Sequence, residues 1–170
     1  YGTGEASEIA PRQVLIKIIE LLKEENLKAI VAPELEFYLC EQNLDPDLPL
    51  KTPVGKSGRR ETGSRVFGID AVNEFDALTD DIYDYCELME IGVDTLVHES
   101  GPSQIEINLN HGDPLALADQ AFMFKRAVRQ VALKHGIHAT FMAKPYQGQP
   151  GSSMHIHQNL VSTKTNKNLF

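Results

Sequence analysis

Apolar residues recur along the chain with two different spacings, one typical of helices and one typical of strands. Spacings of three and four residues predict amphipathic helices over 11–26, 76–91 and 114–135. Alternation of apolar and polar residues predicts strands over 28–40, 93–99, 104–110, 137–143 and 154–160. We therefore predict an α+β fold with a mostly antiparallel sheet, one face of which is packed by the three helices while the other is polar.

Residues at the predicted helix ends support these boundaries. Pro11 lies where the first turn of a helix tolerates proline, and we expect Gly92 to end the second helix. Asp113 followed by Pro114 is typical of a capped helix start, and we expect Gly136 to end that helix. A loop rich in Gly, Pro and Ser then leads into the last predicted strand.

The polar faces of the predicted strands carry the residues best suited to chemistry. Residues two apart on a strand share a face, so Glu34 and Glu36 lie opposite the apolar side chains of their strand. The same rule places Asn159 beside the two histidines of the last strand. Together, the strands offer one polar face with Glu34, Glu36, Glu99, Glu106, His155 and His157.

This collection of side chains favours a cation site. Carboxylates that crowd one face disfavour each other's ionised form, and a bound cation removes that conflict. Carboxylates with one or two imidazoles suit Mg²⁺ or Mn²⁺ better than zinc, and ligands for two ions favour phosphoryl transfer. The alternative is a solvent-facing sheet whose glutamates keep the protein soluble. For His155 and His157, metal binding, phosphate contact and neither role all stay open.

The segment 41–65 is rich in turn residues, and we predict a mobile loop that contains a short hairpin. Its basic residues are Lys51, Lys56, Arg59, Arg60 and Arg65. They indicate either a basic flap near an anionic substrate or a solvated loop without such a role.

Length and charge narrow the class of protein. The 170 residues, 42% of them hydrophobic, suit one domain with a substantial core. The net charge of −8 and the pI near 5.2 argue against a nucleic-acid partner or an anionic membrane. The negative charge is uneven, since no Lys or Arg occurs from Val66 to Phe124.

Further features concern the cellular location. Cys40 and Cys86 lack metal-type spacing, so we expect reduced thiols. No apolar run is long enough to span a membrane, and the first residues do not resemble a signal peptide. We therefore expect a cytoplasmic protein. Because the sequence starts without Met and stops at Phe170 with no closing element, we also expect a fragment of a longer chain.

Four segments, in this order and at compatible spacing, resemble the glutamine synthetase catalytic domain: 32–39 (APELEFYL), 99–106 (ESGPSQIE), 139–145 (ATFMAKP) and 151–157 (GSSMHIH). The likeness extends over essentially the whole chain. It implies a curved antiparallel sheet of the glutamine synthetase/guanido kinase type, with helices on one face. It also implies that residues 1–170 are a partial catalytic domain, without the N-terminal β-grasp domain and the C-terminal part.

The resemblance implies a set of metal ligands for two or more ions, Mg²⁺ or Mn²⁺. Matching positions suggest that Glu36, Glu99 and Glu106 bind one ion. Glu34 and His155 would bind the other.

It also implies roles toward the substrates. His157 would approach the phosphates of ATP, with Asn159 as a weaker nucleotide contact. Gly151 would lie in the loop that binds glutamate, and Glu99 would also act in catalysis by accepting a proton from the attacking amine.

The reaction implied by the resemblance is the ATP-dependent ligation of the γ-carboxylate of glutamate to ammonia or an amine, through a γ-glutamyl phosphate. Typical glutamine synthetases carry Asn-Gly-Ser-Gly-Met-His where this chain carries Pro-Gly-Ser-Ser-Met-His at 150–155. That change and the segment 71–76 (AVNEFD) are more similar to the γ-glutamylpolyamine branch, so we favour an amine over ammonia. We expect the parent protein to form a homo-oligomeric ring and the isolated fragment to be inactive.

Two other hypotheses about the function remain. A non-catalytic relative could keep the fold for assembly, although the chain retains all the ligands expected in this span. A guanidino kinase should lack the paired Glu34 and Glu36 and the face formed by His155 and His157.

Overall fold

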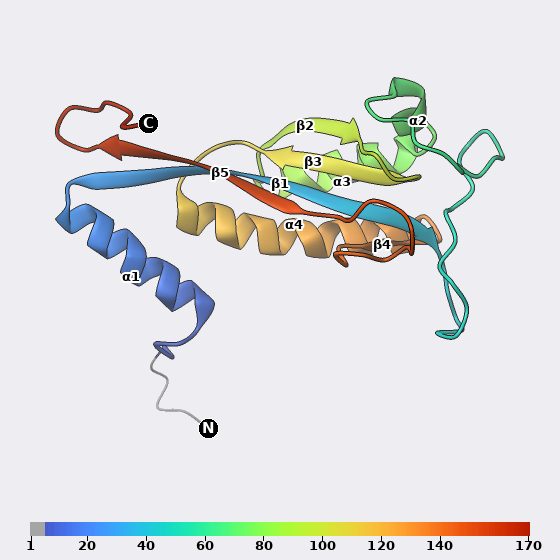
Figure 1. Cartoon of the computed structure of the whole chain (residues 1–170), viewed down its shortest axis with the longest axis horizontal. Coiled ribbons are helices and arrows are strands. Elements are labelled where there is room, and N and C mark those ends of the chain that lie inside the picture. The colour runs from blue at the N-terminus through green and yellow to red at the C-terminus, as the bar shows by residue number, and fades with distance from the viewer. Residues whose placement is uncertain (1–5) are drawn as a thin grey trace.

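In the computed structural model, which describes residues 6–170, an antiparallel sheet carries helices on one face (Figure 1). The helices are α1 (Pro11–Glu24), α2 (Ile69–Asn73), α3 (Asp76–Leu88) and α4 (Pro114–Lys134). The strands are β1 (Leu27–Glu41), β2 (Val93–His98), β3 (Gln104–Leu109), β4 (Ile137–Thr140) and β5 (Met154–Ser162). The predicted α+β fold with a mostly antiparallel sheet is confirmed.

Strand β1 is the centre of the sheet because every other strand except β2 pairs with it. It spans 15 residues and bonds to β3 along one edge. Along its other edge it pairs first with β5, over Leu27–Leu35, and then with β4, over Tyr38–Glu41. The chain between β4 and β5 therefore leaves the sheet and returns to the same edge of β1, which places the loop 141–153 beside the middle of that strand.

The apolar core lies between the sheet and two of the helices. Leu35, Phe37 and Ile107 are at most 1% exposed and belong to one cluster with residues of α3 and α4, among them Ile82 and Phe124. The alternation of apolar and polar residues predicted this face of β1 and β3 correctly. Polar side chains of the same strands consequently lie on the face that the helices leave open.

Helix α1 packs against β1, as predicted, but more loosely than α3 and α4 pack in the core. This helix has no buried residue, and its apolar side chains Val14, Ile18 and Leu21 are about half exposed. It lies near the first half of β1 and contacts α4 through the ion pair of Arg12 and Asp119 (Figure 1). The helical spacing of its apolar residues is real, but the described residues cover that stripe only in part.

Helix α4 begins and ends as predicted, whereas α3 begins at Asp76 as predicted but ends earlier. The Asp113 side chain accepts hydrogen bonds from the amides of Leu115 and Ala116, and Gly136 follows the helix with φ +72°. Helix α3 ends at Leu88, before Gly92, and the chain turns at Glu90, which takes φ +56°. Glycine is the usual residue at such a turn, so a non-glycine residue with positive φ hid this boundary.

Other expectations are met in part. The predicted strand 137–143 is shorter, because β4 ends at Thr140. The loop 41–65 contains a bridge between Val54 and Arg60, which fits the predicted short hairpin. Cys40 and Cys86 are free and buried. Among the described helices, none combines the length and apolar character needed to cross a bilayer.

We predict that Asp113→Ala lowers the free energy of unfolding by about 0.5–2 kcal/mol, because the first turn of α4 loses its side-chain acceptor. Chemical denaturation checks this value. Asp113→Asn is the control, since its amide oxygen can still cap the helix. An equal loss in both variants would contradict a capping role.

Candidate functional site

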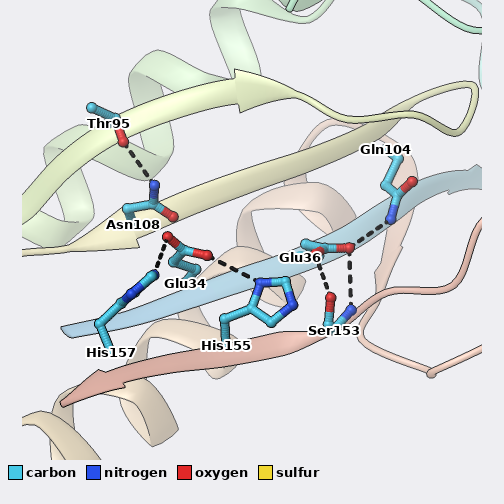
Figure 2. A network of polar contacts seen from close by, with 8 residues as sticks. All are labelled: Glu34, Glu36, Thr95, Gln104, Asn108, Ser153, His155 and His157. Carbon is cyan, nitrogen blue, oxygen red and sulfur yellow. Dashed lines mark hydrogen bonds and ion pairs between the residues drawn. The ribbon is translucent and has the colours of Figure 1, made fainter. Parts of the chain in front are cut away.

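The register of the sheet arranges the polar side chains in rows across neighbouring strands. Glu36 on β1 pairs directly with Glu106 on β3. One row along, Glu34 pairs with Asn108 on β3 and with His155 on β5. Side chains directly opposite each other on antiparallel strands lie about 5 Å apart at Cβ. The sheet therefore brings together residues that are more than a hundred positions apart in the sequence (Figure 2).

Glu34 is held by both predicted site histidines. His155 Nδ1 lies 3.1 Å from Glu34 Oε2, and His157 Nε2 lies 2.7 Å from Oε1 (Figure 2). Burial alone would raise the pKa of Glu34, but the hydrogen bonds with His157 and His155 outweigh it and lower that pKa. Glu34 therefore stays ionised, and the imidazoles are oriented on the open face of β5.

Glu34, Glu106 and His155 form a group that fits a metal ion, since one ligand atom from each lies within 4.8 Å of the others. Two atoms bound to one Mg²⁺ or Mn²⁺ ion can be about 4 Å apart. Burial, followed by the charges of Glu34 and Glu99, raises the pKa of Glu106. A cation would relieve that cost, and two carboxylates with one imidazole suit a hard or borderline ion.

Asn108 adds an oxygen at the same place. Its side-chain amide donates to Thr95 Oγ1 at 2.9 Å, which leaves Oδ1 buried and without a hydrogen-bond partner among the described residues (Figure 2). Buried polar atoms are rarely left unpaired. The alternation of the sequence placed Asn108 on the polar face, but nothing in the sequence distinguished it from a solvated side chain.

Glu36 lies in the next row and is held by donors from the protein itself. Its Oε2 accepts from Gln104 Nε2 at 2.9 Å and from the amide of Ser153 at 3.1 Å. Its Oε1 accepts from the Ser153 hydroxyl (Figure 2). Glu36 is outside the group of Glu34, Glu106 and His155, so the predicted division of ligands between two ions stays a prediction.

Glu99 lies directly after β2 and is partly buried, with its Oε2 accepting from the amide of Ser100 at 3.1 Å. Burial and then the charges of Glu36 and Glu99 raise the pKa of Tyr38 to about 12. Tyr38 therefore remains protonated, and its hydroxyl donates to the carbonyl of Pro150 at 2.7 Å. The charges of Glu36 and Glu99 thus help to keep Tyr38 protonated, and Tyr38 anchors the loop before β5.

The remaining predicted site residues are placed as follows. The carbonyl of Gly151 accepts from Gln104 Nε2 at 2.9 Å, so this buried amide joins the loop to Glu36. Asn159 Oδ1 accepts from Asn168 at 3.1 Å, near the end of the chain. Gln104 was expected on the polar face, but its role as the link between Glu36 and Gly151 was not foreseen.

A buried hydrogen-bonded pair of Glu61 and His98 connects the basic loop to this site. His98 is 1% exposed, with Nε2 2.8 Å from Glu61 Oε2 and Nδ1 2.8 Å from the carbonyl oxygen of Glu99. The amide of Ser103 also donates to Glu61 Oε2, at 2.6 Å. Because a carbonyl oxygen can only accept, Nδ1 carries a proton. No periodic pattern in the sequence reveals this pair, because Glu61 lies in an irregular loop.

The loop borders a cavity of about 450 Å³ whose lining includes Lys56, Arg59, Arg60, Glu61 and Arg65. Two of its cations already have partners, since Lys56 pairs with Asp76 and Arg60 with Glu41. The loop is therefore attached at several points, and its basic residues are not all available to a substrate.

We predict that Glu61→Ala lowers the free energy of unfolding by about 3–5 kcal/mol, because His98 and the amide of Ser103 would be buried without their acceptor. Arg60→Ala is the matched control in the same loop. It breaks a half-exposed ion pair and should cost at most about 1 kcal/mol. Chemical denaturation would contradict the prediction if the two losses were similar.

Comparison with known proteins gives consistent matches. The family model for "Glutamine synthetase, catalytic domain" matches residues 8–170. Gamma-glutamylputrescine synthetase PuuA of Escherichia coli K12 is 40% identical over 163 residues, which cover 95% of this chain and 34% of that protein. A glutamine synthetase of Pyrococcus horikoshii is 34% identical over 170 residues, covering 100% of this chain and 36% of that protein.

Solved structures agree. "Apo GmaS without ligand" matches with a TM-score of 0.82 and 25% identity, covering 100% of this chain and 38% of that one. A glutamine synthetase of Plasmodium falciparum matches with a TM-score of 0.76 and 26% identity over 98% of this chain and 36% of that one. The chain thus spans about a third of the length of the relatives it matches.

Proposed function

The chain belongs to the glutamine synthetase family, and we propose that it forms part of an ATP-dependent ligase that joins the γ-carboxylate of glutamate to ammonia or an amine. The observation that carries this proposal is the group of Glu34, Glu106 and His155 on the open face of the sheet. A family relationship alone is compatible with a protein that has lost activity. A retained cation site is expected of a working ligase.

Metal binding is the first part of the proposal. Glu34, Glu106 and His155 would hold one Mg²⁺ or Mn²⁺ ion, and Glu106 would also join Glu36 and Glu99, on the same face, in holding a second. When bound, such ions neutralise phosphate charge and orient attack on the γ-phosphate of ATP. The imidazoles of His155 and His157 are already oriented by Glu34.

The other site residues would act on the substrates. We assign contacts with the ATP phosphates to His157 and a weaker nucleotide contact to Asn159. Gly151 would contact glutamate from a loop that Tyr38 and Gln104 hold in place. Glu99 would accept the proton that the amine loses when it attacks the γ-glutamyl phosphate, a step that needs water to be excluded.

We further propose an amine rather than ammonia as the acceptor. The 40% identity to gamma-glutamylputrescine synthetase PuuA and the Pro-Gly-Ser-Ser sequence at 150–153 support this. In this chain, Pro150 presents its carbonyl to Tyr38, so the position serves to anchor the loop.

The chain spans about a third of its curated relatives, so we propose that residues 1–170 are a partial catalytic domain. The whole protein would be a cytoplasmic ring of identical subunits in which further segments complete the site. The isolated chain would then be inactive as a ligase.

We predict that the whole protein in which this chain occurs releases phosphate from ATP with Mg²⁺ and glutamate at least about tenfold faster with putrescine than with ammonium. The reason is that the loop 150–153 resembles the polyamine branch and that the chain is 40% identical to gamma-glutamylputrescine synthetase PuuA. Phosphate release with putrescine, monoamines and ammonium is the measurement. Stimulation by ammonium alone would make it a glutamine synthetase. No release with any amine, in a protein that still binds Mn²⁺, would favour the non-catalytic relative.

We also predict that Glu34→Gln and Glu106→Gln each weaken Mn²⁺ binding by at least about tenfold, because each removes a charged ligand from the group. Electron paramagnetic resonance of free Mn²⁺ during a titration measures the affinity. Glu87→Gln, on the exposed side of α3, removes the same charge away from the site and should leave the affinity unchanged. Equal effects of all three substitutions would indicate a general loss of negative charge only.

A further inference from the structure

Ser153, the residue before β5, contacts Glu36 through its carbonyl, its amide and its hydroxyl. Its carbonyl accepts from the amide of Glu36 at 3.2 Å, and its own amide donates to Glu36 Oε2 at 3.1 Å. Its hydroxyl donates to Glu36 Oε1 (Figure 2). Any residue could supply the two backbone contacts, but only a hydroxyl side chain supplies the third.

That hydroxyl lies where this chain differs from the motif that it resembles. In Asn-Gly-Ser-Gly-Met-His, the motif named in the resemblance above, glycine stands at the position of Ser153. Glycine has no side chain with which to contact the carboxylate. The bond between the Ser153 hydroxyl and Glu36 is therefore a property of this chain's own loop sequence.

The donors around Glu36 leave its carboxylate with one free direction. An ionised carboxylate offers about four lone-pair sites, two on each oxygen. Gln104 Nε2 and the Ser153 amide occupy both sites of Oε2, and the Ser153 hydroxyl occupies one site of Oε1. A single site on Oε1 remains for a further partner.

Glu36 lies on the face of the sheet that carries the other carboxylates (Figure 2). Glu36 pairs directly with Glu106 across β1 and β3. Glu36 is only 7% exposed, so its carboxylate is fixed by its donors more than by water. The contacts thus hold the Glu36 carboxyl group in one orientation beside Glu106.

We propose that Ser153 is a positioning residue that fixes Glu36 as a one-oxygen ligand, through Oε1, for a divalent cation shared with Glu106. The proposal rests on the proposed metal-dependent function and adds the residue that sets the affinity and geometry of Glu36. Hydrogen-bond partners that orient metal ligands commonly change metal affinity by about 10–100-fold when they are removed. Without the hydroxyl, Oε1 has two open lone-pair sites instead of one and loses the donor that orients it, so the prepared geometry is lost.

The test is Mn²⁺ binding to the whole protein, measured by electron paramagnetic resonance without ATP, glutamate or amine. Ser153→Ala and Ser153→Gly should each weaken binding by about tenfold. Ser153→Thr keeps a hydroxyl and should bind within about twofold of the unchanged protein, a margin well inside the expected loss. Ser152→Ala is the control in the same loop, because the Ser152 hydroxyl contacts Gln104 at 3.4 Å and not Glu36.

Each outcome decides the matter. Unchanged or tighter binding in Ser153→Ala would overturn the proposal, as would equal weakening in Ser153→Ala and Ser153→Thr. Failure of the unchanged protein to bind Mn²⁺ would overturn the proposed metal-dependent function itself. Normal Mn²⁺ binding with the expected effect of Ser153→Ala, in a protein that ligates no amine, would support the role of Ser153 and reject the ligase.

Discussion

Carboxylates on one face of the sheet repel each other, and the rest of the site depends on how the surrounding contacts offset that repulsion. Each carboxylate is treated differently. Glu34 is balanced by two histidines, and Glu36 accepts three hydrogen bonds from Gln104 and Ser153. Glu106, by contrast, has a raised pKa caused by burial and by its charged neighbours. The unrelieved charge is therefore concentrated at Glu106, which makes the centre of this face the natural place for a cation.

Local sequence patterns predicted the parts of the fold that depend on neighbours in the sequence. Alternation along β1 and β3 identified both the buried face and the polar face, since a strand has a strict period of two. The cap of α4 was recognisable because Asp113 acts on amides two and three residues away. The end of α3 was missed because Glu90 adopts a positive φ, which is not expected of a glutamate.

Contacts between distant segments were beyond the reach of such patterns. The pair of Glu61 and His98 joins an irregular loop to a strand end, and neither residue type indicates its partner. The packing of α1 depends on what its apolar stripe faces, which periodicity does not specify. Resemblance to a family supplied the list of site residues, and the structure supplies their neighbours: Gln104, Asn108 and Ser153.

Gln104 has a consequence for how such a protein can change over evolution. One buried amide donates to Glu36, on the proposed metal face, and to the carbonyl of Gly151, in the proposed substrate loop. The two regions consequently depend on the same side chain and do not vary independently. A mutation that reshapes the loop for a new substrate also disturbs Glu36, so changes of specificity within the loop require compensation on the sheet. Lineages that diversify their substrates should therefore do so mainly through residues that do not contact Gln104.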